Sequence, residues 1–338
     1  ALILLARASA GTPCLADARG EAARPGSAVA ELGKASPHGL ARPLAYPVTR
    51  RDDVVETQFG VEVADPYRWL EADVRGDREV EAWVAAENEE TFRYLADLPG
   101  RDTLRDRMAR LYGYERYGTP RKAGQRYFFT RNSGLQNQSP LYVREGLGGA
   151  ETLLLDPNGF AADGAVALAE WLPSQDGRYL LYSVQDAGTD WRVVRVVDVD
   201  SGKTLGDRLE WIKYSTFAWA SDGAGFYYSR FPPPADGSKF QSTVENQQIW
   251  FHRIGTAQSD DQLIFATPER PELRHAGRVT DDGRWLVVTS SIGPDQRHEL
   301  SLLSLTDPKA KPVRMVRGMD DVDEEGIVRR VKVWELAV

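Results

Sequence analysis

The hydrophobic pattern of the chain is dominated by a unit in which a polar turn precedes a short apolar strand. The unit occurs four times, as KAGQRYFFTRN (122–132), SQDGRYLLYSV (174–184), ASDGAGFYYSR (220–230) and TDDGRWLVVTS (280–290). Aligned on Gly124, Gly177, Gly223 and Gly283, the units are 53, 46 and 60 residues apart. Glycine accepts the positive φ of a tight turn, so each unit predicts a turn that leads into a strand.

Further apolar strands lie between these units, in SPLYVRE, WRVVRVVDVDSG, QQIWFHRIG and HELSLLSLTD. A recurring step of about 50 residues with several strands is the size of a four-stranded propeller blade. A generic β-sandwich is the alternative, and the recurrence disfavours it. We therefore predict an all-β fold in which residues 116–338 form a partial β-propeller of four to five blades, with 327–336 as a fifth strand entry.

Residues 46–115 show helical spacing instead. One helix is predicted over 76–98, where these apolar and neutral residues share a face: Val80, Trp83, Val84, Thr91, Tyr94 and Leu95. A second helix follows Leu98-Pro99-Gly100 and ends near Gly113. Upstream, in DPYRWLE (65–71), Pro66 suits a first helical turn, so Asp65 is predicted to be an N-cap. We assign 46–115 to a short α-helical N-terminal segment.

The leader over residues 1–45 has a different composition. Its opening, ALILLARASAG, resembles the end of a secretory signal, although the chain begins at Ala1 without Met. Low-complexity sequence is the alternative, because 11–45 are rich in Ala, Gly, Pro and Arg. We expect 1–45 to be disordered. A signal remnant would place the protein in the periplasm or outside the cell, and otherwise the cytoplasm is expected.

Charge and composition narrow the partners. The 338 residues are 42% hydrophobic and 27% charged, with a net charge of −8 and no basic runs. Nucleic acids and anionic membranes bind clustered positive charge, so neither is an expected partner. No apolar run approaches the roughly 18 residues that cross a bilayer. The single cysteine, Cys14, cannot form an intrachain disulfide.

Catalytic motifs are missing from the sequence. No serine has glycine at both flanking offsets of a Gly-x-Ser-x-Gly nucleophile elbow. Glycine pairs such as Gly148-Gly149 lack the residues of a phosphate-binding loop, so no cofactor is expected. The paired acids Asp52-Asp53 and Asp281-Asp282 are interpreted as solvated turn residues. We therefore predict no catalytic residue in this chain.

The histidines do not form a metal site either. The chain has four, His38, His252, His275 and His298, and none has a second histidine at metal-ligand spacing. We interpret them as loop or strand-surface residues, and expect no metal.

Several passages together resemble the prolyl oligopeptidase family: DPYRWLE (65–71), WVAAENEETFRYL (83–95), RYFFTRNSGLQNQSPLYVRE (126–145) and DWRVVRVVDVDSG (190–202). The stretch 132–138, followed by Leu141-Tyr142, separates the chain from the oligopeptidase B branch, which cuts after basic residues. The resemblance extends from about Tyr46 to at least Arg317 in one order and without large gaps.

The resemblance implies a serine peptidase that cuts short peptides after proline. In this family a seven-bladed propeller is inserted into an α/β-hydrolase domain, covers the active site and filters substrates by size. The family's nucleophile, acid and histidine lie in the later hydrolase portion, and none matches a residue here. The final strand also leaves an open sheet edge, so we expect the chain to be truncated, to lack its hydrolase domain and to be inactive alone.

One site residue follows from the resemblance. The family places a propeller aromatic near the proline-binding pocket, in a passage that matches WIKYS (211–215), and Tyr214 occupies its position. An aromatic buried in a blade is the alternative for Tyr214. The partners implied are short proline-containing peptides, through the complete enzyme, and the hydrolase domain itself. The competing function is a stand-alone propeller that binds proteins without catalysis.

Overall fold

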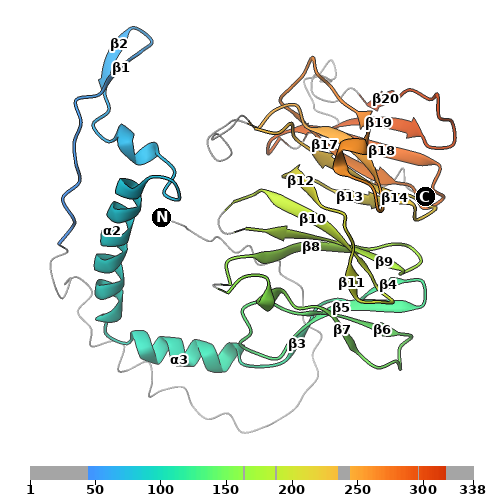
Figure 1. Cartoon of the computed structure of the whole chain (residues 1–338), viewed down its shortest axis with the longest axis horizontal. Helices are drawn as coiled ribbons and strands as arrows, with labels where there is room; N and C mark the ends of the chain where they lie inside the picture. The colour runs from blue at the N-terminus through green and yellow to red at the C-terminus, as the bar shows by residue number, and fades with distance from the viewer. Residues whose placement is uncertain (1–44, 163, 187–188, 235–243, 296, 317–338) are drawn as a thin grey trace, which may run out of the picture. The chain divides into compact units, whose positions relative to one another are not determined.

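The computed structural model describes residues 45–162, 164–186, 189–234, 244–295 and 297–316 (Figure 1). The expectations for the leader, for Cys14 and His38, and for the fifth strand entry at 327–336 lie outside these residues. The chain divides into two compact units, with the boundary between Arg107 and Met108. No helix within the described ranges is long and apolar enough to cross a membrane.

The helices of the N-terminal segment form where they were predicted. Helix α2 (Arg78–Ala96) begins at Asp77, whose carboxylate accepts hydrogen bonds from the backbone N–H groups of Glu79 (2.9 Å) and Val80 (3.0 Å). These bonds satisfy donors that the first turn of a helix leaves free. Helix α3 (Arg101–Tyr112) follows after a short connection. The sequence prediction of two helices is confirmed.

The prediction that Asp65 caps a helix is wrong. Strands β1 (Val55–Gln58) and β2 (Val61–Ala64) form a hairpin that the sequence pattern did not predict. The hairpin extends to Asp65, whose N–H donates to the Val54 carbonyl oxygen (2.8 Å). Only a 3-10 turn, η1 (Arg68–Glu71), follows, and it has no side-chain cap. The Asp65 carboxylate binds the Arg68 guanidinium instead. The 3-10 turn begins at Arg68, so the N-cap position belongs to Tyr67 and Asp65 lies two residues before it.

The described part of the second unit contains four antiparallel sheets after the end of α3 (Figure 1). The first contains β3 (Arg116–Tyr117), β4 (Arg121–Ala123), β5 (Arg126–Asn132), β6 (Leu141–Glu145) and β7 (Thr152–Leu155), followed by the 3-10 turn η2 (Pro157–Gly159). The second contains β8 (Ala167–Pro173), β9 (Tyr179–Gln185), β10 (Arg192–Asp198), β11 (Lys203–Thr204) and β12 (Leu209–Ile212), the last paired with β10.

The third sheet contains β13 (Phe217–Trp219), β14 (Gly225–Arg230), β15 (Gln248–Arg253) and β16 (Gln262–Phe265), with the 3-10 turn η3 (Gln258–Asp260) before its last strand. The fourth contains β17 (Leu273–Val279), β18 (Trp285–Ile292), β19 (Glu299–Ser304) and β20 (Val313–Val316). The four units seen in the sequence supply β5, β9, β14 and β18, each of which is an inner strand next to an edge strand of its sheet. The predicted all-β propeller architecture is confirmed.

The sheets are held together by apolar side chains from both faces of their strands. In β9, Leu180 and Tyr182 belong to a core shared with the first sheet, whereas Leu181 belongs to a core shared with the third. In β14, Phe226 packs toward the second sheet, and Tyr227 packs toward the fourth. Successive strand residues point to opposite faces, so one strand contributes to two cores.

The repeated glycines mark the turns that precede these strands. Gly124, Gly177, Gly223 and Gly283 all have positive φ, at +55°, +74°, +68° and +70°. The first two turns also lie against each other, because the Gly124 N–H donates to the Gln175 carbonyl oxygen (2.9 Å). An added Cβ at Gly177 would lie 2.6 Å from the Ala123 carbonyl oxygen. At Gly223 it would meet no atom within 4 Å.

This difference gives a matched pair of variants. Gly177→Ala and Gly223→Ala each force a non-glycine residue to positive φ, which costs about 1 to 2 kcal/mol. Gly177→Ala must also relieve a backbone overlap, for roughly 1 to 3 kcal/mol more. Urea denaturation of the two variants should therefore show the larger loss for Gly177→Ala. Equal losses would contradict the contact between the first two turns.

Candidate functional site

Tyr214 lies in the connection between the second and third sheets. Strand β12 ends at Ile212 and β13 begins at Phe217, so residues 213–216 cross from one sheet to the next. The pairing of Arg192 with both Gln185 and Ile212 places this crossover at the same edge as the β9–β10 connection. Tyr214 is 48% exposed, which differs from the alternative of an aromatic buried inside a blade.

The backbone of the crossover is held in an uncommon conformation. Tyr214 has φ of +50° and Trp211 has φ of +62°, values that L-residues adopt only when the surroundings impose them. The buried amide of Gln247 supplies that constraint. Its Nε2 donates to the carbonyl oxygens of Lys213 (3.0 Å) and Tyr214 (3.3 Å), and its Oε1 accepts from the N–H of His275 (2.7 Å). One side chain thereby connects the crossover to β17.

Two hydroxyl groups strengthen this connection. Ser215 Oγ accepts a hydrogen bond from the Ser229 N–H of β14 (2.9 Å). Thr216 Oγ1 accepts from the N–H of Gly277 (3.1 Å) and donates to the Gly277 carbonyl oxygen (3.3 Å). The crossover is thus bonded to both the third and the fourth sheet, which fixes the position of Tyr214.

The Tyr214 side chain lies among charged groups. Its hydroxyl donates to Asp190 Oδ2 (2.8 Å), and this bond raises the pKa of the phenol and lowers the pKa of the Asp190 carboxyl. Lys213 Nζ lies 3.4 Å from the same carboxylate oxygen and 5.4 Å from the centre of the Trp191 ring. The guanidinium carbon of Arg274 lies 4.3 Å from the centre of the Tyr214 ring.

This arrangement is suited to binding. An exposed aromatic ring, with Arg274 and Lys213 over it and its hydroxyl fixed by a carboxylate, offers a rigid surface for an apolar or cyclic group. The Asp190 carboxylate is engaged by Tyr214 and Lys213, so it is poorly placed to act as a general base. Across the described ranges, no group of three or more His, Cys, Asp or Glu side chains is arranged to hold a metal ion.

Sequence reasoning identified Tyr214 and missed its neighbours. Lys213 was part of the same passage, but its pairing with Asp190 depends on the proximity of the β9–β10 connection. Gln247 and Arg274 are 33 and 60 residues further along the chain than Tyr214. No local pattern marks any of them, because only the pairing of sheets brings these positions together.

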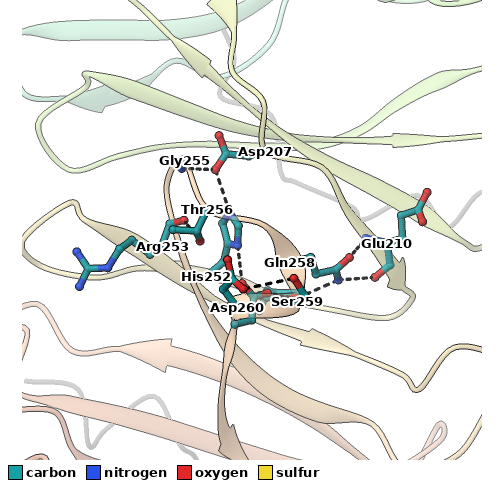
Figure 2. A network of polar contacts seen from close by, with 11 residues as sticks. Asp207, Glu210, His252, Arg253, Gly255, Thr256, Gln258, Ser259 and Asp260 are labelled. Carbon is teal, nitrogen blue, oxygen red and sulfur yellow. Dashed lines mark hydrogen bonds and ion pairs between the residues drawn. The ribbon is translucent and has the colours of Figure 1, made fainter.

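The prediction that His252 and His275 lie in loops or on strand surfaces is wrong. Both are strand residues with fully buried side chains. Figure 2 shows the contact of His252 with Asp207, in which Nε2 lies 2.9 Å from Asp207 Oδ1. The other ring nitrogen, Nδ1, lies 2.7 Å from Asp261 Oδ1, so His252 bonds two carboxylates. Strand β15 contributes to cores on both of its faces, through Trp250 on one and Ile249 on the other, so a polar residue within it is buried with partners. His298 is exposed in the β18–β19 connection, as expected.

The two buried histidines titrate in opposite directions. Burial opposes the charged form of His252, but Asp207 and Asp261 outweigh it and raise its pKa to about 9. His275 has neutral hydroxyl partners, Ser290 Oγ (2.8 Å) and Thr267 Oγ1 (3.1 Å). Burial therefore lowers the pKa of His275 to about 4. His252 is an imidazolium in a structural link between the second and third sheets, and His275 is neutral.

The acid pair of the last repeated turn has the structural role that its sequence predicted. Asp282 accepts hydrogen bonds from the Thr280 hydroxyl (2.6 Å) and from the N–H of Arg284 (3.0 Å). These bonds lower the pKa of Asp282 to about 2, which is the behaviour of a turn acid.

Comparison with known proteins agrees with the fold and with the sequence motifs. The family model for the prolyl oligopeptidase N-terminal beta-propeller domain matches residues 46–328. The chain belongs to the prolyl oligopeptidase family. The resemblance carried by DPYRWLE and the downstream passages is thereby confirmed.

Individual relatives cover most of this chain but less than half of their own length. A prolyl endopeptidase from Elizabethkingia meningoseptica is 36% identical over 277 residues, which are 82% of this chain and 38% of that protein. A solved structure from a mechanistic study of two prolyl endopeptidases is 44% identical, covering 80% of this chain and 39% of that chain, with a TM-score of 0.56.

A third relative was solved with a peptide. Prolyl oligopeptidase B from Galerina marginata, bound to a 35mer hydrolysis and macrocyclization substrate, is 25% identical with a TM-score of 0.68. The match covers 81% of this chain and 41% of that chain. The chain therefore spans about two fifths of the length of the prolyl oligopeptidases that it matches.

The His252 link gives a prediction for stability against pH. The folded-state pKa of about 9 lies above the ordinary value of 6.5, so the folded state binds the proton more tightly. The resulting stabilisation is fully present below about pH 6.5 and is lost as pH rises through 9. We expect the free energy of unfolding to fall by roughly 2 to 3 kcal/mol between pH 6.5 and 9.5.

Urea denaturation at a series of pH values measures this loss. In His252→Gln the alkaline slope should flatten, because the titrating group is gone. An unchanged slope in that variant would contradict the assignment. If the variant does not fold, an NMR titration of the His252 ring in the unmodified chain decides the matter, and a pKa below 6.5 would refute the imidazolium.

Proposed function

We propose that this chain is the propeller-bearing portion of a serine-type prolyl oligopeptidase that cleaves short peptides after proline. Residues 46–115 are the helical segment of that enzyme and residues 116–338 belong to its propeller, which filters substrates by size. The family match over 46–328 supports this proposal. Further support comes from relatives named as prolyl endopeptidases and from one solved with a peptide substrate.

The observation that carries the proposal is the exposed, fixed ring of Tyr214. A residue whose backbone has positive φ costs free energy to hold, and here it is held by three sheets through Gln247 and neighbouring hydroxyls. An aromatic side chain that is 48% exposed gains less from packing than one buried in a blade. Its rigid placement is explained if the ring contacts a ligand.

In the complete enzyme, Tyr214 would act in binding and orienting the peptide. Its ring flanks the substrate near the proline, and the bond from its hydroxyl to Asp190 fixes the plane of the ring. An aromatic contact of this kind is worth about 0.5 to 1.5 kcal/mol beyond the burial of area. The chemical steps belong to catalytic groups that no residue of this chain matches.

This role predicts the effect of removing the ring. In a complete peptidase that contains this propeller, Tyr214→Ala should lower kcat/KM for a fluorogenic peptide cleaved after proline by roughly three- to tenfold. Thermal stability should change little, because the ring is exposed. Tyr214→Phe is the matched control, since it keeps the ring and loses only the bond to Asp190, and it should retain most of the activity.

Two results would count against the proposal. A complete enzyme with no cleavage after proline would reject the proposed reaction. If Tyr214→Ala instead lowers the melting temperature by several degrees while kcat/KM of the folded fraction is unchanged, the ring supports the fold and does not contact the substrate.

A further inference from the structure

Arg274 is the cation that lies nearest the Tyr214 ring among the residues that the structure describes. Its guanidinium lies against the Tyr214 ring, with 4.3 Å between the guanidinium carbon and the ring centre. No carboxylate forms an ion pair with it among the residues that the structure describes. The neighbouring arginine of the β16–β17 connection differs in this respect, because Arg270 pairs with Glu299 (2.5 Å) and with Glu272 (3.6 Å).

The other cation of the site is already paired. Lys213 Nζ lies 3.4 Å from Asp190 Oδ2, and the same oxygen accepts the Tyr214 hydroxyl. Two cations therefore lie against the ring, and the Asp190 carboxylate is paired with Lys213. The excess positive charge of the site resides on Arg274, although the chain as a whole has a net charge of −8.

The position of Arg274 is fixed by the same contacts that hold Tyr214. Arg274 directly precedes His275 in β17, and the His275 N–H donates to Gln247, whose amide also binds the carbonyl oxygen of Tyr214. The His275 carbonyl oxygen accepts a further bond from Ser229 Oγ (2.6 Å). The spacing between the cation and the ring is therefore set by buried hydrogen bonds, as expected of a prepared binding surface.

We propose that Arg274 is a specificity-determining residue that binds a carboxylate of the peptide substrate while Tyr214 contacts the segment near the proline. The inference rests on the proposed function and narrows its substrate class to proline-containing peptides with a nearby acidic group. A guanidinium presents several N–H donors in one plane, which matches the two oxygens of a carboxylate. Contact with the face of a ring does not use the N–H groups as hydrogen-bond donors, and among the described residues no ion pair engages them.

Matched peptides test this assignment in the complete peptidase. Each fluorogenic peptide carries one proline and a single Glu at one of the three positions before it, and its partner carries Gln at the same position. For at least one position, kcat/KM should favour the Glu peptide by roughly three- to tenfold. Arg274→Gln should remove that preference, Arg274→Lys should retain part of it, and Arg274→Glu should reverse it. Added salt should weaken it.

The control is Arg253→Gln, an exposed arginine at the opposite end of the third sheet, where it pairs across from Gly225. It removes the same charge from β15 of the third sheet, whereas Arg274 lies in β17 of the fourth sheet, so the Glu preference should remain. Melting temperatures of the variants verify that each is folded. Should Arg274→Gln not fold, the charge-reversed and lysine variants still report the ratio.

The outcomes separate this inference from the function on which it rests. Cleavage of both peptides after proline with a ratio that Arg274→Gln does not change would overturn the role of Arg274 and leave the proposed function intact. Equal cleavage of Glu and Gln peptides at every position by the unmodified enzyme would do the same. No cleavage of either peptide after proline would overturn the proposed function and this inference together.

Discussion

The buried amide of Gln247 is the contact on which the candidate site depends. It satisfies two carbonyl oxygens of the crossover between the second and third sheets and one N–H of the fourth sheet. Removing this amide would leave these three backbone groups without a hydrogen-bond partner. Each buried group left unpaired costs about 1 to 3 kcal/mol. Together with the hydroxyl groups of Ser215 and Thr216, this side chain holds the backbone of Tyr214 close to β17, which carries Arg274. The site is therefore a property of the propeller framework.

The same framework explains which parts of the fold could be read from the sequence. Turn glycines at steps of about 50 residues predicted the sheets, since a tight turn with positive φ has a local signature. Gly124 and Gly177 meet that expectation and also allow neighbouring turns to approach each other. The helix at α2 was equally readable, because Asp77 and the apolar spacing are both local signals.

What could not be read depends on pairing between distant segments. His252 was predicted to lie in a loop or on a strand surface. In the structure it lies in β15, which contributes side chains to cores on both of its faces. The sequence around Asp65 resembled a helix cap, but in the structure the Asp65 N–H extends the β1–β2 hairpin by bonding to the Val54 carbonyl oxygen. No sequence pattern marked Arg274, because the ring that it contacts, Tyr214, lies 60 residues earlier in the chain. The family resemblance identified Tyr214 as a site residue. Its contacts with Asp190, Gln247 and Arg274 became known only from the structure.

The central claim is that a peptide substrate contacts the fixed ring of Tyr214. A structure of a complete peptidase containing this propeller, with an uncleaved proline-containing peptide bound, tests it most directly. We expect peptide atoms near the proline to lie within about 4 Å of the ring, the distance of van der Waals contact. A peptide clearly bound elsewhere, with the Tyr214 ring touching only Asp190, Lys213 and Arg274, would contradict the account.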